Sequence, residues 1–317
     1  MIAAVSSSDG IGEIGIVDFD RVDISNLQRQ IIHNQNDIGK NKAQSAKEKV
    51  LQLNPNVKVS LHEVRLDTTN AIEIFSTYDL IIDCTDNFAT RYLVNDAAAL
   101  LGKPYIWGSI YRFDGQASVF WSKEGPCYRC LHPTPPPAGS VPSCAEGGVL
   151  GVLCGAIGSI QSNEALKLIT GVGNSLLGSL LIYDALDSSY KKVEIKKSAN
   201  CPICNGTQSS LLPDYEEFCG IGEAITAQEL RKKSGHFLID VREPDEHSAL
   251  SIPGAILIPM DKFEDGSAFA QIPADKEVIL HCRSGVRSAK CLVLLKAAGF
   301  NNSKHLKGGI IAWEESK

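Results

Sequence analysis

Residues 12–30 read GEIGIVDFDRVDISNLQRQ, an apolar run that ends in acids and passes into a polar turn. Such a run is typical of a strand in a nucleotide-binding α/β sheet, where ligands bind beyond the carboxyl ends of the strands. A first strand, a glycine-rich turn and a helix usually precede it. Here the preceding segment is short, MIAAVSSSDGI, and we expect it to be the end of a helix and a turn.

Outward from this stretch, strand and helix patterns alternate. Helical spacing covers residues 40–54 and 89–102, and strand-like runs cover 57–64, 78–85, 104–110 and 115–121. This order predicts a Rossmann-like, mostly parallel sheet with helices on both faces. The proline-rich residues 133–143 are predicted to form an exposed loop. A buried helix over 147–170 and strands at 179–186 and 190–197 complete the pattern.

A smaller α/β pattern follows. Helices are predicted at 226–233 and 287–299, with strands at 237–242 and 277–282. About 95 residues are enough for an independent domain. We therefore predict a first domain over residues 1–208, a linker over 209–222 and a second domain over 223–317.

The composition of the chain indicates which classes of protein and which partners are to be expected. The 317 residues are 44% hydrophobic, carry a formal net charge of -6 and include ten cysteines. An acidic chain argues against nucleic acid as a direct partner. The sequence shows no apolar run long enough to span a bilayer and no signal-peptide pattern. We therefore expect a cytoplasmic protein without a membrane partner. Cysteines in that setting indicate metal binding or catalysis.

Polar residues follow two of the predicted strands. Asp18 suits ribose hydroxyls, and the planar fork of Arg29 suits phosphate oxygens, with Lys42 as a second cation. Asp86 and Asn87 follow the strand at 78–85, where a carboxylate can hold Mg²⁺ between phosphates. Taken singly, each of these residues is more simply read as a solvated loop residue. Together, at successive strand ends, they favour a nucleotide site.

The motifs VDFDRVDISNLQRQ (17–30), GKNKA (39–43), DCTDN (83–87) and GPCYRC (125–130) resemble the MoeB/ThiF family of adenylating enzymes, relatives of the ubiquitin-activating enzymes. The likeness runs from about Gly10 to Gly206. It implies that the carboxyl terminus of a ubiquitin-like protein attacks the α-phosphate of ATP to give an acyl-adenylate. It also implies Mg²⁺ on Asp86 and the ATP ligands Asp18, Ser25, Asn26, Leu27, Gln28, Arg29, Lys42 and Asn87.

Members of that family have a strand and a GxGGxG turn before the first helix. This chain is expected to start inside that helix, as an N-terminally truncated form. The first strand is central in such a sheet, so its absence would split the hydrogen-bonding order and remove phosphate-binding amides. Adenylation by this chain alone is then an open question.

Two CxxC pairs, Cys127 with Cys130 and Cys201 with Cys204, predict a closed tetrahedral Zn²⁺ site. A redox role for each CxxC is the alternative, but two pairs in one intracellular domain favour structural zinc. The resemblance agrees with zinc.

Cys144 lies after the proline-rich loop, just before a predicted helix start, where a thiol gains thiolate character. From its position alone, a small buried cysteine is equally expected. The family resemblance assigns it to the crossover-loop thiol, which in relatives forms a covalent link to the carrier or to a sulfur donor.

The segment VILHCRSGVRSAKC (278–291) places Cys282 between a strand and a helix. Loop amides and two arginines there would stabilise a charged persulfide. Phosphatase loops are one residue longer between cysteine and arginine. With LIDVREPDEHSALSIPGAILIP (238–259) and LKGGIIAW (306–313), residues 221–317 resemble a rhodanese domain. That likeness makes Cys282 the persulfide carrier, within the loop Arg283, Ser284, Gly285, Val286 and Arg287.

The order of the two domains resembles the eukaryotic molybdopterin-synthase sulfurylases. It implies a carrier ending in Gly-Gly, a sulfur donor such as a cysteine desulfurase, and roles in molybdenum cofactor synthesis and tRNA thiolation. A homodimer is expected if the adenylation domain is complete. Two alternatives stay open: a sulfurtransferase alone, or a non-catalytic partner whose cellular effect survives Cys282→Ala.

Overall fold

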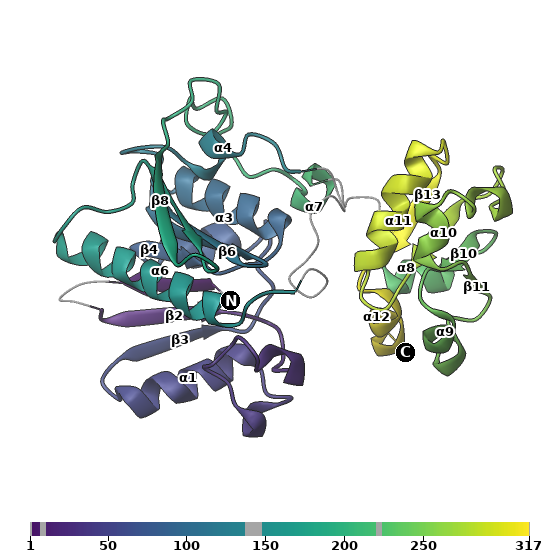
Figure 1. Cartoon of the computed structure of the whole chain (residues 1–317), viewed down its shortest axis with the longest axis horizontal. Helices are drawn as coiled ribbons and strands as arrows, with labels where there is room; N and C mark the ends of the chain where they lie inside the picture. Colours follow the sequence, from purple (N-terminus) through teal and green to yellow (C-terminus); the bar gives the residue numbers. More distant parts are fainter. Residues whose placement is uncertain (1, 7–10, 137–147, 220–223, 317) are drawn as a thin grey trace. The chain divides into compact units, whose positions relative to one another are not determined.

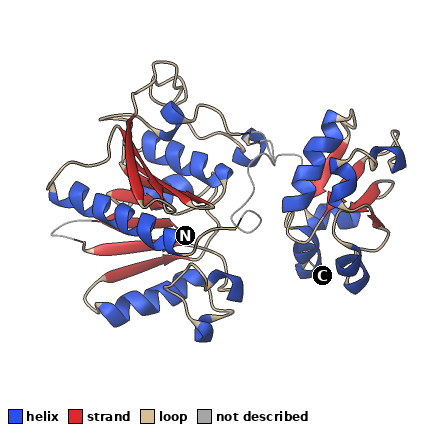
Figure 2. Cartoon of the chain, viewed as in Figure 1, coloured by secondary structure: helices blue, strands red, loops and turns tan. Residues whose placement is uncertain are grey.

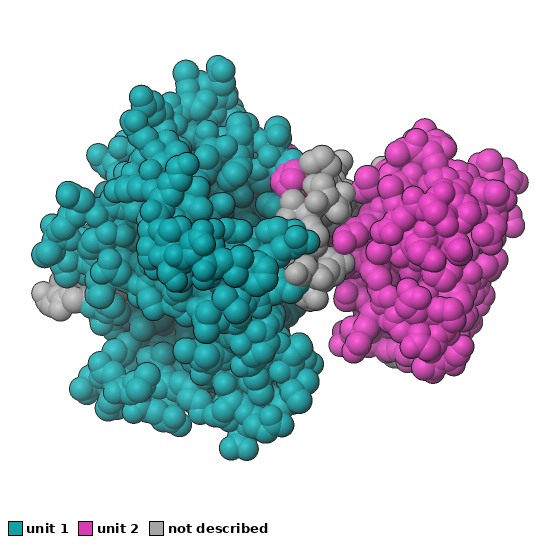
Figure 3. Space-filling view, in the orientation of Figure 1, with its two compact units in different colours: residues 1–135, 142–215 teal, residues 136–141, 216–317 magenta. Residues whose placement is uncertain are grey.

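The computed structural model describes residues 2–6, 11–136, 148–219 and 224–316 (Figure 1). The chain divides into two compact units, residues 1–135 with 142–215 and residues 136–141 with 216–317 (Figure 3). Each unit has its own sheet with helices packed on it (Figure 2), which confirms the predicted α/β class. None of the helices in these described ranges is long and apolar enough to cross a membrane.

The first unit is built on an eight-stranded sheet with the order β3-β2-β1-β4-β5-β6-β7-β8. β2 pairs in parallel with β3, and β4 with β5, and these four strands run in one direction. From β5 to β8, neighbours pair antiparallel. The strands are β1 (Ile2–Ser6), β2 (Glu13–Val17), β3 (Lys58–His62), β4 (Leu80–Asp83), β5 (Tyr105–Tyr111), β6 (Asp114–Phe120), β7 (Ser179–Asp184) and β8 (Ser189–Glu194).

Residues 2–6 form a strand, so the prediction of a helix end for this segment is wrong. β1 pairs antiparallel with β2 on one side, Ile2 opposite Val17, and with β4 on the other, Ile2 opposite Asp83. The physical reason is that β2 and β4 each present a row of backbone donors and acceptors that must be paired inside a sheet. An extended run of small and apolar residues satisfies both rows. The centre of the sheet, predicted to be split, is thereby continuous.

Helices cover both faces of this sheet. α6 (Val152–Thr170) packs on β4, β5 and β6 around Ile106 and Val119. α3 (Phe88–Leu100) lies on the opposite face, because Tyr105 precedes Ile106 on β5 and donates its hydroxyl to Asn95 Oδ1 at 3.2 Å. The other described helical segments of this unit are η1 (Ile24–Asn26), η2 (Gln35–Asp37), α1 (Lys42–Leu53), α2 (Ala71–Ser76) and α4 (Tyr128–Leu131). α7 (Tyr215–Phe218) begins at the last residue of the unit.

The second unit has a five-stranded parallel sheet with the order β11-β10-β12-β13-β9. Leu280 belongs to an apolar cluster with α10 and α11, whereas its neighbour Ile279 belongs to another with α8 and α12. Successive residues of this strand therefore pack into two apolar cores, one on each face of the sheet. The elements are β9 (Ala224–Ile225), α8 (Ala227–Lys232), β10 (Phe237–Asp240), α9 (Pro244–Ala249), β11 (Ile256–Leu257), α10 (Met260–Glu264), η3 (Phe269–Gln271), β12 (Val278–His281), α11 (Val286–Ala297), β13 (Ser303–Leu306) and α12 (Gly309–Glu315).

Candidate functional site

Polar residues gather where β2 ends. The buried Asp18 accepts a hydrogen bond from Asp20 N at its Oδ1, at 2.9 Å. Asn41 Oδ1 caps α1 by accepting from Gln44 N at 3.1 Å, which fixes the start of the helix that carries Lys42. Lys42 Nζ lies 3.1 Å from Asp20 Oδ2. Asp18 and Lys42, both predicted ATP ligands, are therefore brought together through Asp20, which offsets part of the lysine charge.

The next predicted ligands lie on the short helix η1. Asp23 Oδ1 accepts from Ser25 N at 2.8 Å, and Asn26 Oδ1 accepts from Asp23 N at 3.1 Å, so a reciprocal capping box closes the N-terminal end of the turn. Arg29 Nη1 donates to Ser25 O at 3.1 Å. Leu27 follows η1 as its C-cap. Local hydrogen bonds thus give this segment a defined conformation, while Ser25 stays exposed.

Gly151, which the sequence pattern did not single out, lies against Gln28. A Cβ at Gly151 would overlap Gln28 O and approach Gln28 Oε1 to 2.9 Å. Glycine at this position therefore lets the start of α6 pack directly against the predicted nucleotide segment. Nothing in the local pattern around residue 151 reveals this contact, because its partner is far away in the sequence.

At the end of β4, Asp86 and Asn87 are exposed, and Asn87 Oδ1 caps α3 by accepting from Thr90 N at 2.8 Å. β2 and β4 flank β1, so their ends lie roughly 10 Å apart, two strand spacings. The buried Asp83 was missed within an apolar run. Its Oδ2 has no hydrogen-bond partner in the described part of the chain, and burial raises the pKa of this carboxyl. Asp86, by contrast, is exposed.

The two CxxC pairs meet in one cluster. The four sulfurs of Cys127, Cys130, Cys201 and Cys204 lie within 4.8 Å of one another. Neighbouring sulfurs are 3.4 Å (Cys127–Cys201), 3.6 Å (Cys130–Cys204) and 3.9 Å (Cys127–Cys130) apart. Thiolates about 2.3 Å from a tetrahedral zinc ion are about 3.8 Å apart. The cluster therefore has the donor set and spacing of a closed metal site.

The thiols in this cluster affect one another. The hydrogen bond between Cys127 and Cys130 lowers the pKa of Cys130 and raises that of Cys127, because the S–H of one stabilises the thiolate of the other. Ser198 N also donates to Cys130 Sγ at 3.4 Å. Four thiolates this close together need a cation to offset their repulsion.

A buried carboxylate ties the cluster to α3. Asp96 accepts two hydrogen bonds from Arg129, at 2.8 and 2.7 Å, and Arg129 stands between the two cysteines of the first pair. The Tyr215 hydroxyl donates a hydrogen bond to Asp96 Oδ2 at 2.7 Å, and Gln208 Nε2 donates a second one to the same oxygen at 3.1 Å. One carboxylate thereby holds both the first CxxC segment and the chain that follows the second.

Cys144 lies outside the described residues. Cys282 follows β12, is 1% exposed, and accepts a hydrogen bond at Sγ from Gly285 N at 3.1 Å. Gly285 caps α11 with φ 95°, a left-handed conformation that favours glycine. The loop therefore curls its backbone around the sulfur, as expected for a site that binds an anionic sulfur species.

A second glycine, Gly309, allows the start of α12 to pack against the backbone of the loop that carries Cys282. Ile310 N donates to Cys282 O at 2.8 Å and Ile311 N to Arg283 O at 3.2 Å. Gly309 has φ 59°, and a Cβ there would overlap Cys282 O and lie 2.6 Å from Arg283 O. The start of α12 is thus fitted to the loop backbone.

The two loop arginines differ in their surroundings. Arg283 is exposed, whereas Arg287 makes two 2.7 Å bonds to Glu246 on α9. Arg287 therefore lies next to the loop with part of its charge offset by a carboxylate.

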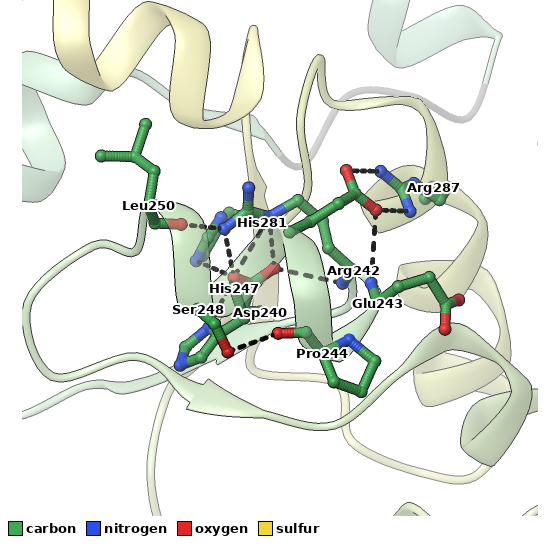
Figure 4. A network of polar contacts seen from close by, with 10 residues as sticks. Asp240, Arg242, Glu243, Pro244, His247, Ser248, Leu250, His281 and Arg287 are labelled. Atoms are coloured by element: carbon green, nitrogen blue, oxygen red, sulfur yellow. Dashed lines mark hydrogen bonds and ion pairs between the residues drawn. The ribbon is translucent and has the colours of Figure 1, made fainter.

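Asp240 is at the centre of a polar network that includes Arg242, His247 and His281 (Figure 4). It accepts from Arg242 Nη2 at 2.6 Å and from Nε at 2.9 Å, and His247 Nδ1 lies 2.8 Å from it. Arg242 Nη2 also donates to Leu250 O at 2.6 Å. His281 Nε2 is 3.8 Å away, and neither ring nitrogen has a hydrogen-bond partner in the part of the chain described. These groups join α9 to the sheet, and the hydrogen bonds to Cys282 Sγ in the described part of the chain come from other residues, Gly285 and Ser288.

Comparison with known proteins assigns both units. Residues 2–203 match the family model "ThiF family", and residues 224–316 match "Rhodanese-like domain". The chain is 53% identical over 322 residues to "Probable adenylyltransferase/sulfurtransferase MoeZ" of Mycobacterium tuberculosis, covering 96% of this chain and 81% of the relative. It is 38% identical over 330 residues to "Adenylyltransferase and sulfurtransferase MOCS3" of Drosophila grimshawi, covering 96% and 74%.

Two further similarities concern the first unit. "Sulfur carrier protein adenylyltransferase" of Thermus thermophilus is 51% identical over 219 residues, 67% of this chain and 80% of the relative. The crystal structure titled "Crystal structure of E. coli MccB + MccA-N7isoASN" has a TM-score of 0.55 at 20% identity, covering 61% of this chain and 60% of that one. At that identity the structural likeness shows the fold alone.

Proposed function

This chain belongs to the ThiF family and carries a rhodanese-like domain after it, and on that premise we propose a two-step sulfur-transfer enzyme. The first step is ATP-dependent adenylation of the C-terminal glycine of a ubiquitin-like sulfur carrier. The second is transfer of sulfur from a Cys282 persulfide to give a thiocarboxylate. The observation that carries the proposal is the buried Cys282 sulfur with Gly285 N–H 3.1 Å away, in a chain that also has the polar edge formed by β2 and β4.

In the adenylation step, the carrier carboxylate attacks the α-phosphate of ATP and pyrophosphate leaves. Asp18 would accept hydrogen bonds from ribose hydroxyls, and Arg29 and Lys42 would offset phosphate charge. Asn87, Ser25, Asn26, Leu27 and Gln28 would line the same edge. Asp86 would hold Mg²⁺, which offsets the charge of the phosphates.

In the sulfur step, the Cys282 thiolate takes a sulfane sulfur from a donor persulfide, and the electron pair of the broken S–S bond leaves with the donor thiolate. The terminal sulfur then attacks the acyl-adenylate and AMP leaves. Attack by the Cys144 thiolate on Cys282 Sγ would release the thiocarboxylate and leave a disulfide between the two cysteines. An external thiol must reduce that disulfide for the next cycle.

The finer assignments belong to the same proposal. Zinc is proposed for the four-cysteine cluster, because a closed set of four thiolates at this spacing suits a structural zinc site. The proposed partners are a carrier ending in Gly-Gly, a cysteine desulfurase as donor, and a second copy in a homodimer. The cytoplasm is the proposed location, with molybdenum cofactor synthesis and tRNA thiolation as the pathways served.

ATP–pyrophosphate exchange tests the first step. The full chain is incubated with Mg²⁺, labelled pyrophosphate and a carrier ending in Gly-Gly, and Arg29→Ala serves as the matched variant. We expect carrier-dependent label in ATP that is lost in the variant. Absence of exchange in the unmodified chain would refute adenylation by this chain.

A second candidate, a sulfurtransferase without adenylation, is favoured by β1. This strand runs antiparallel between β2 and β4. A nucleotide-binding sheet of this type has a parallel strand there, whose carboxyl end leads into the phosphate-binding turn. If exchange is absent while the chain still transfers sulfur from thiosulfate to cyanide, this candidate is the correct one.

A further inference from the structure

Ser288 is a buried hydroxyl that faces the sulfur of Cys282. It lies in the first turn of α11 and is 0% exposed. Its Oγ is 3.7 Å from Cys282 Sγ and 3.1 Å from Gly285 O. A serine hydroxyl has one proton to donate. Ser288 therefore donates to the sulfur or to the carbonyl, but not fully to both.

The Gly285 carbonyl does not depend on this proton. It already accepts the first hydrogen bond of α11, from Ala289 N at 3.1 Å. The hydroxyl can therefore turn away without leaving a buried acceptor unpaired, which would cost free energy.

Cys282 Sγ, in contrast to the Gly285 carbonyl, has few hydrogen-bond donors around it. The residue is 1% exposed and belongs to an apolar cluster with Val241, Cys291 and Leu292. Among the described residues, the donors that reach Sγ are Gly285 N–H and the Ser288 hydroxyl. A buried anion needs such donors, and a hydrogen bond to an ion is stronger than one to a neutral group.

We propose that Ser288 is a catalytic residue of the sulfur step, and this inference rests on the proposed persulfide at Cys282. Its hydroxyl donates to Cys282 Sγ when that sulfur is a thiolate and to Gly285 O when the sulfur is neutral. When a sulfane sulfur binds to Sγ, the charge moves to the terminal sulfur and the hydroxyl turns to Gly285 O. The thiolate forms again when an external thiol reduces the Cys144–Cys282 disulfide, and Ser288 then donates to it. In transfer to cyanide, the cyanide attacks the terminal sulfur, the S–S bond breaks, its electron pair returns to Sγ, and Ser288 donates to the forming thiolate.

The test is Ser288→Ala in the full chain, with two measurements. The first is the rate at which iodoacetamide alkylates Cys282 at a series of pH values, followed on the Cys282 peptide by mass spectrometry. We expect the midpoint of the alkylation profile to move up by about one pH unit, because a hydrogen bond to a charged group changes the thiolate population roughly tenfold. The second is the rate of sulfur transfer from the preformed persulfide to cyanide, which should fall roughly tenfold. Ser288→Thr, which keeps the hydroxyl, should restore both.

Ser303→Ala is the matched control. Ser303 is a buried serine of the same unit whose hydroxyl donates to Phe300 O at 2.7 Å, away from the sulfur. It should leave the alkylation profile unchanged. If Ser288→Ala does not fold, as judged by thermal unfolding, Ser288→Thr is compared with Ser288→Val, which has the same shape and lacks the hydroxyl.

An alkylation profile that is the same in wild type and Ser288→Ala overturns the proposal, as does an equal shift in Ser303→Ala. Failure of the proposed function looks different. In that case wild-type Cys282 gains no sulfur atom by mass when treated with thiosulfate or a persulfide donor, whatever the alkylation profile shows.

Discussion

Glu246 and Arg287 face each other as a bidentate pair, with Arg287 Nη1 and Nη2 each 2.7 Å from a carboxylate oxygen. The pair joins α9 to the first turn of α11, next to the loop that carries Cys282. The Arg287 hydrogen bonds lower the pKa of Glu246, so this carboxylate stays ionised at neutral pH. It therefore weakens the attraction that Arg287 would otherwise exert on an anion entering the loop.

Glu246→Gln should raise kcat/KM for thiosulfate, a dianionic sulfur donor, because Arg287 keeps its charge and loses its counter-ion. We expect roughly a fivefold increase, the size of a partly exposed charge interaction. Asp245→Asn removes the same charge from an exposed position on the same turn. An equal increase in both variants would show that the bidentate pair has no special role.

Gly309→Ala should abolish most sulfurtransferase activity. A Cβ at this position overlaps Cys282 O, and displacing the loop by about 1 Å can cost on the order of 100-fold in rate. Gly299→Ala is the control, because Gly299 also has a positive φ of 96° but nothing lies within 4 Å of its Cβ position. If both variants lose activity equally, backbone strain and not the overlap is responsible.

Asp96→Asn should destabilise the first unit by about 3 to 5 kcal/mol, because Arg129 is left as a buried charge without its partner. Urea unfolding measures the change in the free energy of unfolding, and the protection of the α3 amides from hydrogen exchange shows whether this helix is the part that is loosened. Asp187→Asn, at an exposed turn, should change stability by less than about 0.5 kcal/mol. A cost at Asp96 no larger than at Asp187 would contradict the role of this carboxylate in holding the two segments.

Removal of metal should loosen the first unit and leave the second intact. Four thiolates without a cation repel one another, so a chelator should speed proteolysis of residues 1–206 while the Cys282 unit stays resistant. Cys127→Ser should bind at most weakly held zinc, measured as metal content per chain. Cys154→Ser, a cysteine outside the cluster, should keep one zinc ion. Unchanged proteolysis after chelation would exclude a structural metal.

The second unit should lose stability between pH 6.5 and pH 4. Burial lowers the pKa of His281 from 6.5 to about 4, so over this range the unfolded chain binds a proton that the folded chain does not. The free energy of unfolding should therefore fall by about 3 kcal/mol as the pH drops through the window. His281→Leu should reduce this slope in urea unfolding at pH 7 and pH 4.5 and leave the part that comes from His236, whose pKa burial also lowers. An unchanged slope would assign the pH dependence to other groups.

Asp240 acts at lower pH. Burial raises its pKa, but hydrogen bonds from Arg242 and His247 and the nearby His281 outweigh this, and the net shift is downward. A carboxyl with a lowered pKa contributes stability above its unfolded pKa of about 3.9, and that stability is lost as the pH falls through the folded value. Its contribution therefore persists across the His281 window.

The periodicity of apolar residues and the spacing of glycines and prolines were sufficient to predict most of the fold. The helical repeat at 40–54 became α1, the apolar run at 78–85 became β4, and the strand-to-helix junction at Cys282 was visible as an apolar run followed by a glycine loop. The meeting of the two CxxC pairs also followed from chemistry, because two thiolates complete half of a tetrahedral site.

Other features depend on partners that a local pattern does not contain. Residues 2–6 are small and apolar and suit a helix or a strand, and the open sides of β2 and β4 decide between them. Glu246 reads as one of several acids near the start of a helix until the fold places it against Arg287. Gly151 matters because of Gln28, more than a hundred positions earlier.

The position of β1 has a consequence for the order in which the sheet forms. Ile2 pairs with Val17 in a nearby strand but also with Asp83, across a long stretch of chain. Closing a long loop costs more entropy than closing a short one, and contacts distant in sequence form slowly. We therefore expect the β1–β2 pairing to form early and the β1–β4 pairing to form later, once the chain between them has been brought together. The β1–β4 pairing is thus expected to be among the last parts of this sheet to form.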